Sequence, residues 1–314
     1  MKIAHISDLH ICSEYLPQNL DKTEFLIRMA LQKNIDHLVI TGDISHRSLP
    51  MDYHMFRELL IKYGFYTPDK VTLVFGNHDI YGGVHLFEEI YHFLDQCKKI
   101  NPLSKVNHLG RVLASSFAGT TRFDKNNFFP FVKIVGPVLF LGLDSTAPYS
   151  YLKNPAASNG LIQNKDFALL KHILLNKDYK DYRKIILIHH HLFSCKNSKK
   201  PCTGNITDFI ERQIMKLHQR KKLIHYLKKY PVDFVLHGHI HYNSLYHIGK
   251  TPVFCAGGSI EDEIDQMMKL NIINIENGRI KAWTESFYNE QFTKEIPRTA
   301  EHKHSTHPSK MYAY

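Results

Sequence analysis

The sequence predicts an α/β protein in which two packed sheets are flanked by helices. Short runs rich in Ile, Val and Leu alternate with helical patterns near both ends of the chain, which is typical of parallel strands joined by helices. The part between these regions is richer in strand patterns. With 314 residues and 43% hydrophobic content, the chain is long enough to bury a substantial core.

The first part of the chain predicts three strands and two helices. Residues 2–7, 37–41 and 71–75 are short apolar runs bounded by polar residues, as in buried strands. Residues 20–34 and 52–63 place apolar side chains three and four positions apart, which predicts helices. This alternation favours a largely parallel sheet.

The middle part predicts strands at residues 112–117, 131–135 and 138–143. Gly136 and Pro137 separate the last two runs and indicate a turn. We therefore expect a strand-rich segment between two α/β regions.

Strand and helix patterns alternate again in the second half of the chain. Strands are expected at residues 185–188 and 234–236, preceded by helical patterns at residues 166–175 and 220–230. Further strands are expected at residues 244–248, 253–256, 270–275 and 280–283. The pair Asn277-Gly278 between the last two is a strong hairpin signal.

The composition indicates in which compartment the protein resides and what kind of partner it binds. The sequence contains no run of eighteen apolar residues, and its first residues lack the features of a secretory signal. Its five cysteines form no CxxC pair, which favours a reduced, cytoplasmic protein. The formal charge of +10 favours anionic partners. The oligomeric state does not follow from the sequence.

Side chains that can bind metals follow five of the predicted strands. In chain order they are Asp8 with His10, Asp43, Asn77 with His78 and Asp79, His189 with His190 and His191, and His239 with His241. Because the carboxyl ends of parallel strands face the ligand crevice in such sheets, we expect these groups to converge. Mixed nitrogen and oxygen donors suit Mn²⁺, Fe or Zn²⁺ better than Ca²⁺ or Mg²⁺.

The spacing of these residues supports a shared centre. Residues two apart in an extended segment point the same way, so Asp8 with His10, and His239 with His241, can each reach one centre. Glycines precede the functional groups at positions 42, 76 and 238, where a larger side chain would obstruct a tight turn. The donors are too many for one ion, so we expect two ions that share a carboxylate and activate a hydroxide for attack on phosphorus.

The ordered pattern DxH, GD, GNHD, H and GHxH resembles the calcineurin-like metallophosphoesterases over residues 1–283. The resemblance implies a four-layer α-β-β-α sandwich of two mixed sheets flanked by helices, with a dinuclear metal centre at the sheet edge. The implied ligands of one ion are Asp8, His10, Asp43 and His241. Those of the other are Asp43, Asn77, His189 and His239, so that Asp43 bridges the ions. His190 is the alternative to His189 as the ligand.

The same resemblance implies roles around the metals. His78 would stabilise the phosphoryl oxygens or protonate the leaving group, and Asp79 would fix the tautomer of His78. His237 is expected to be held by backbone rather than to bind a metal. Contacts to the substrate phosphate are expected from Arg47, Arg122 and His190.

The substrate is the least determined part of this interpretation. Leu143-Asp144-Ser145 and the run of three histidines resemble the small-molecule phosphodiesterase branch, although Leu192 stands where that branch usually has proline. We expect hydrolysis of a cyclic nucleotide or a glycerophosphodiester, with Mn²⁺ ahead of Fe or Zn²⁺. The alternative is a UDP-acylglucosamine pyrophosphatase of lipid A synthesis. A nuclease and a non-catalytic metal-binding scaffold remain as further alternatives.

The domain organisation predicted is simple. Residues 1–290 would form the metallophosphoesterase domain, in which residues 192–217 form a cap or a basic insertion that could touch the inner membrane face. Residues 291–314 would form a polar tail. We expect a small anionic phosphoester as the partner and no stable nucleic-acid complex, because no basic strip interleaved with aromatic residues stands out.

Overall fold

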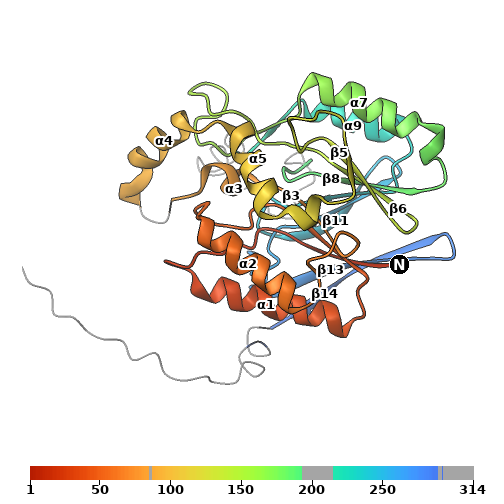
Figure 1. Cartoon of the computed structure of the whole chain (residues 1–314), viewed down its shortest axis with the longest axis horizontal. Helices are drawn as coiled ribbons and strands as arrows, with labels where there is room; N and C mark the ends of the chain where they lie inside the picture. Colours follow the sequence, from red (N-terminus) through yellow and green to blue (C-terminus); the bar gives the residue numbers. More distant parts are fainter. Residues whose placement is uncertain (85–86, 193–214, 289–291, 293–314) are drawn as a thin grey trace, which may run out of the picture.

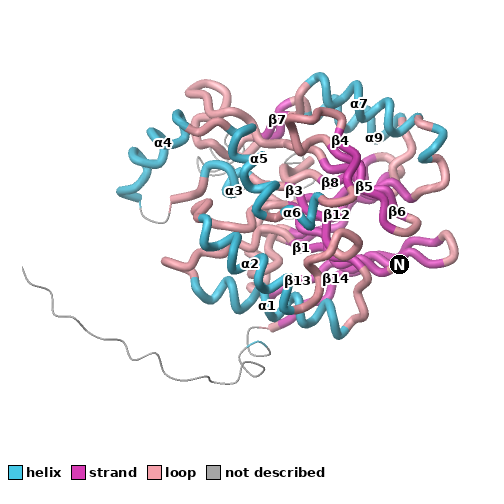
Figure 2. Tube along the Cα trace, viewed as in Figure 1, coloured by secondary structure: helices cyan, strands magenta, loops and turns pink. Residues whose placement is uncertain are grey.

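In the computed structural model, which describes residues 1–84, 87–192, 215–288 and 292, two mixed sheets pack face to face between layers of helices (Figure 1). Helices α1 and α2 cover one outer face, and α7 and α9 cover the other. The predicted four-layer α-β-β-α sandwich is confirmed. The strands of both sheets lie together in the centre of the molecule (Figure 2).

The first sheet has five strands in the order β14-β13-β1-β2-β3. Their bounds are β1 Lys2–Ile6, β2 His37–Thr41, β3 Val71–Val74, β13 Met268–Glu276 and β14 Arg279–Phe287. β1, β2 and β3 run parallel, and β13 pairs antiparallel with β1. Helices α1 (Pro17–Gln32) and α2 (Pro50–Lys62) both begin at a proline, which fits the first helical position because that residue needs no backbone N–H partner.

The second sheet has seven strands in the order β11-β12-β10-β8-β6-β5-β4. Their bounds are β4 Thr120–Arg122, β5 Phe131–Val135, β6 Val138–Gly142, β8 Arg183–Leu187, β10 Phe234–His237, β11 Asn243–Ile248 and β12 Thr251–Ala256. Side chains of its central strands alternate between two cores. In β6, Val138 and Phe140 face the first sheet, whereas Leu139 and Leu141 pack with the residues of α7 (Asn164–Leu175) and α9 (Arg220–Lys229).

The remaining elements connect the layers. They are α3 Asn77–Tyr81, η1 Phe87–Glu89, α4 Ile90–Lys99, α5 Pro102–Val112, α6 Ala114–Phe117, η2 Lys177–Tyr179 and the short pair β7 Gly160–Leu161 with β9 Leu217–His218. Gly136 turns the chain between β5 and β6 as predicted, and Asn277 and Gly278 form the predicted hairpin, both with positive φ.

The predicted strand at residues 112–117 is wrong. These residues form the end of α5 and all of α6. The buried side chains Val106 and Leu109 are three positions apart on one face of α5, and Leu113 separates this helix from α6, which contains the buried Phe117. The short run rich in apolar residues was ambiguous because only its longer upstream context shows this period.

Two parts of the predicted organisation fall mainly outside the described residues. These are the cap or basic insertion at residues 192–217 and the polar tail at residues 291–314, so both stay predictions. Among the helices that the structure describes, none combines the length and the apolar character needed to cross a bilayer.

Candidate metal centre

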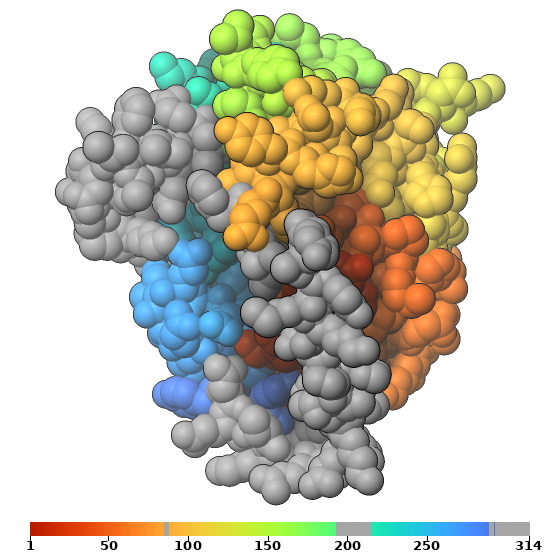
Figure 3. Space-filling model, turned by 90° about the vertical axis from the view of Figure 1, so that its left-hand side faces the viewer, coloured from red at the N-terminus to blue at the C-terminus, as the bar shows by residue number. Residues whose placement is uncertain are grey.

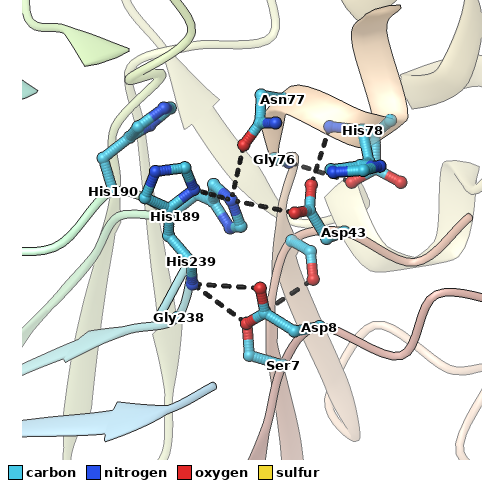
Figure 4. Close-up of polar contacts among 12 residues, drawn as sticks. Ser7, Asp8, Asp43, Gly76, Asn77, His78, His189, His190, Gly238 and His239 are labelled. Atoms are coloured by element: carbon cyan, nitrogen blue, oxygen red, sulfur yellow. Dashed lines mark hydrogen bonds and ion pairs between the residues drawn. The ribbon is translucent and has the colours of Figure 1, made fainter. Parts of the chain in front are cut away.

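The predicted metal-binding side chains come together where the two sheets meet at the carboxyl ends of their strands. Asp8 and His10 follow β1, Asp43 follows β2, and Asn77 begins α3 after β3. From the second sheet, His189 follows β8 and His239 follows β10. Figure 4 shows Asp8, Asp43, Asn77, His189 and His239 pointing toward one another from these separate elements.

Among the described residues, three groups of three side chains have potential ligand atoms within 4.8 Å of one another. The first group consists of Asp8, His10 and His241, the second of Asp43, His189 and His239, and a third of His10, His46 and His78. The Asn77 amide oxygen lies 3.2 Å from Nε2 of His189, beside the second group. The first two groups follow the two predicted ligand sets, with the Asp43 carboxylate at the second group.

The hydrogen bonds of His189 indicate which ring nitrogen faces the centre. Its Nδ1 lies 2.7 Å from the Thr41 carbonyl oxygen, so Nδ1–H donates there and Nε2 is the nitrogen that faces the centre. Around Nε2 lie Asn77 Oδ1 at 3.2 Å, Asp43 Oδ2 at 3.3 Å and His239 Nδ1 at 3.2 Å. This set of oxygen and imidazole donors around one point fits a divalent metal ion.

The electrostatics of this group favour positive charge. Burial alone would lower the pKa of His189, but the adjacent Asp43 carboxylate, helped by Asp8, raises it to about 9. Burial raises the pKa of the Asp8 carboxyl. The position between these side chains therefore attracts a cation, which is what a metal site requires.

The first group is more open to solvent. Nε2 of His10 and Nε2 of His241 lie 3.3 Å apart, and His241 Nε2 lies 4.0 Å from Asp8 Oδ1. The His241 side chain is 41% exposed, whereas that of His189 is fully buried. On the face shown in Figure 3, atoms of the N-terminal segment lie at the bottom of a recess. A substrate would reach the first group from solvent.

The backbone around the centre turns sharply instead of staying extended. Asp8, His10, Asp43 and His239 all have positive φ, between 44° and 74°, a conformation that non-glycine residues rarely adopt. The expected extended spacing is therefore wrong, because β1 ends at Ile6 and β10 ends at His237. Hydrogen bonds hold the turns, including His239 N–H to the Asp8 carboxylate at 3.0 Å.

The glycines before these residues allow the close packing that was predicted. Gly42 has φ +100°, and a Cβ there would lie 2.6 Å from both Gly76 N and His189 Nδ1. A Cβ at Gly238 would overlap the side chains of Ser7 and Asp8. Larger residues at either position would push the ligand loops apart.

A family model described as calcineurin-like phosphoesterase matches residues 1–243, most of the chain. The chain belongs to the calcineurin-like phosphoesterase family. Membership makes it a metal-dependent phosphoric ester hydrolase, and members of the family use two divalent metal ions. The family does not specify which ester is hydrolysed or which metals are bound.

Solved structures support the fold. A dimetal phosphatase from Danio rerio superposes with a TM-score of 0.58 at 13% identity, covering 92% of this chain and 99% of that chain. A purple acid phosphatase from yellow lupin (Lupinus luteus) seeds gives a TM-score of 0.52 at 14% identity, over 96% of this chain and 57% of the lupin chain. A search of curated proteins finds no match. At these identities the likeness concerns the fold alone.

His78 lies beside the first group, with its ring 4.7 Å from that of His10. The expectation that Asp79 fixes its tautomer is wrong. His78 Nδ1 lies 3.0 Å from the His46 carbonyl oxygen, which fixes the tautomer instead. The Asp79 carboxylate accepts hydrogen bonds from the backbone N–H groups of Ile44, Ser45 and Gly76, and so holds the loops after β2 and β3 together.

The three predicted phosphate contacts have other partners in the structure. Arg47 pairs with Glu14 at 3.5 Å and with Glu89 at 3.3 Å. Arg122 lies over the Phe128 ring at the edge strand β4 and lines a different cavity. His190 points away from Asp43 (Figure 4), and its Nδ1 and Nε2 meet Ser145 Oγ at 2.8 Å and the Ser158 carbonyl at 3.2 Å. With both nitrogens bonded, His190 is neither free to contact phosphate nor suited to replace His189 as a ligand.

His237 is held as expected, with its ring nitrogens 2.9 Å from the Gly238 carbonyl and 2.9 Å from the Tyr246 hydroxyl. Two further residues at the centre were missed. His46 Nδ1 lies 3.4 Å from His10 Nδ1, and Glu263 Oε1 lies 3.4 Å from His241 Nδ1. His46 could have been noticed in the sequence because it stands three residues after Asp43. No sequence pattern points to Glu263, because only the fold brings it close to His241.

Proposed function

We propose that the protein is a phosphodiesterase that hydrolyses a small phosphodiester such as a cyclic nucleotide or a glycerophosphodiester. The observation that carries this choice is the charge balance beside the metal centre. Arg47, the arginine nearest in sequence to Asp43, is already paired with Glu14 and Glu89. A diester carries one negative charge, whereas a monoester carries close to two near neutral pH and calls for an additional cation.

The side chains would divide the work between binding ions and handling protons. Asp8, His10 and His241 would hold one ion, Asn77, His189 and His239 would hold the other, and Asp43 would contribute to both. When bound, the ions would neutralise the phosphoryl oxygens and lower the pKa of water. With Nδ1–H held by the His46 carbonyl, His78 presents Nε2 toward the substrate, where the protonated ring would donate to a phosphoryl oxygen or to the leaving group.

The remaining parts of the proposal rest on the sequence. Mn²⁺ is the metal we propose first, because mixed imidazole and carboxylate donors accept it readily. A cytoplasmic location follows from the cysteine pattern alone. The UDP-acylglucosamine pyrophosphatase alternative depends on a cap at residues 192–217, and no observation on the described residues favours it.

The test compares two model esters on protein stripped of metal and reloaded with Mn²⁺. We expect bis-p-nitrophenyl phosphate to turn over with a higher kcat/KM than p-nitrophenyl phosphate. Asp43→Ala should abolish both activities, and the exposed Asp181→Ala should leave them unchanged. A preference for the monoester would refute the diesterase assignment while leaving family membership intact.

A further inference from the structure

A second group of cationic side chains lies away from the metal ligands, at the edge strand β4. Arg111 from α5, Arg122 from β4 and Lys125 from the following loop line a cavity of about 410 Å³. None of the residues that line this cavity belongs to either metal-binding group. The cavity is therefore a separate feature of the surface.

The residues that line this cavity include three cations and no acid, and the neighbouring Asp124 carboxylate accepts from the Asn126 backbone N–H. The ion pairs formed by the described residues include none with Arg111, Arg122 or Lys125. Three cations around one hollow repel each other and attract an anion. Arginine is suited to this role because its planar fork of donors matches the oxygens of phosphate.

Arg111, Arg122 and Lys125 are exposed, and the buried Phe128 ring between them fixes how their elements lie relative to one another. Phe128 is 7% exposed, and the Arg122 guanidinium carbon lies 3.8 Å from the centre of its ring. On α5, Gly110 packs so closely against this ring that a Cβ would lie 2.8 Å from it. The ring thus joins the helix that carries Arg111 to the strand that carries Arg122.

Asn107 lines the same cavity and holds the loop that carries Lys125. Its Nδ2 donates to the Asn126 carbonyl at 2.8 Å, which ties α5 to this loop.

We propose that this cavity binds a phosphate group, with Arg111, Arg122 and Lys125 on its oxygens. The site goes beyond the proposed hydrolysis, since it needs neither the metals nor His78. The phosphate could be free inorganic phosphate or the monoester end of a small molecule, because both present the same charged oxygens.

The test is equilibrium dialysis of the metal-loaded protein against radiolabelled inorganic phosphate. We expect one phosphate at the metal centre and one at the cavity. In the double variant Arg111→Gln/Arg122→Gln, the phosphate of the cavity should bind at least about tenfold more weakly. The control Lys171→Gln/Lys221→Gln removes the same charge from exposed positions and should bind this phosphate as the wild type does. Equal phosphate binding by the wild type and the arginine variant would overturn the proposal.

Two further arms separate the sites and identify the ligand. The Asp43→Ala variant should still bind one phosphate in the cavity. This result does not depend on the metal centre or on the diesterase assignment. Loss of all phosphate binding in Asp43→Ala would contradict a separate site. Stronger displacement by glycerol 3-phosphate than by inorganic phosphate would assign the group to a larger molecule, and weaker displacement would assign it to free phosphate.

Discussion

The histidines at the metal centre and those inside the sheets differ in what their ring nitrogens meet. In the interior, the nitrogens of His37 lie 2.7 Å from the Asp69 carbonyl and 2.9 Å from the Thr72 hydroxyl. His190 likewise has an oxygen partner on each nitrogen. In both, one of the two partners is a hydroxyl, which can donate. At the centre, His189 also has oxygen atoms at both nitrogens, but those of Thr41, Asp43 and Asn77 can only accept.

This contrast separates a structural imidazole from one prepared for a metal. A neutral histidine has one donor and one acceptor nitrogen, so two oxygen atoms of suitable type complete its bonding. Where the acceptor nitrogen instead meets other acceptors, only a cation completes the arrangement. Burial does not make the distinction, since His37, His189 and His190 are all fully buried.

The largest expected effect comes from replacing the adjacent residues His189 and His190, one at a time, with alanine. His189→Ala should lower kcat/KM about a thousandfold or more and remove one bound metal ion per chain, because a ligand is lost. His190→Ala should keep both ions but cost about 1–3 kcal/mol of unfolding free energy, because Ser145 and Ser158 lose a buried partner. Metal content by mass spectrometry and urea unfolding measure the two effects. Loss of metal in His190→Ala alone would reverse the assignment.

His78→Ala tests whether the half-buried histidine beside the first group acts on the substrate. We expect kcat to fall about 100- to 10,000-fold, because a positioned proton donor is removed, while both metal ions stay bound. Steady-state kinetics with a diester substrate measure this, and the exposed His54→Ala is the control. Unchanged kcat would exclude His78 from the reaction.

Glu263→Gln probes an outer partner of a predicted ligand. Its carboxylate lies 3.4 Å from Nδ1 of His241 and orients the ring, so metal affinity should fall about 10- to 100-fold. Calorimetric titration of Mn²⁺ into stripped protein measures the change, with the exposed Glu276→Gln for comparison. Equal affinity in both variants would show that Glu263 does not support His241.

The smallest expected effect concerns a buried carboxyl group, that of Asp144, and the pH dependence of stability. Burial raises the pKa of Asp144 to about 6, although the Thr146 N–H bonded to it opposes the shift. Because its pKa in the unfolded chain is near 4, the folded state binds the proton more strongly, and stability falls as the pH rises from 4 to 6. Relative to Asp144→Asn, the wild type should lose about 1–2 kcal/mol of unfolding free energy between pH 5 and pH 7.5. A difference independent of pH would contradict the raised pKa.

Much of the fold, and the set of side chains that converge on the candidate metal centre, could be predicted from the sequence. The predicted strands β1, β2 and β3 and the groups that follow them are local patterns, visible within a few residues. The strand predicted at residues 112–117 was wrong because a short apolar run does not distinguish a strand from a helix, and the helical spacing of Val106 and Leu109 lies upstream of it.

The partners of individual side chains could not be predicted, because tertiary contacts decide them. Asp79 is adjacent to His78 in sequence, yet its carboxylate bonds loop backbone, and His46 supplies the carbonyl that His78 needs. Arg122 has the right chemistry for phosphate, but the fold places it at the β4 edge. Sequence spacing shows which groups exist, whereas hydrogen-bond accounting shows what each one faces.

The most direct test of the dinuclear centre is anomalous diffraction from crystals grown with Mn²⁺. We expect two peaks about 3.5–4 Å apart. One should lie among Asp8, His10 and His241, the other among Asn77, His189 and His239, with an Asp43 oxygen between them. A single peak, or a peak beside His190 with none beside His189, would contradict the account.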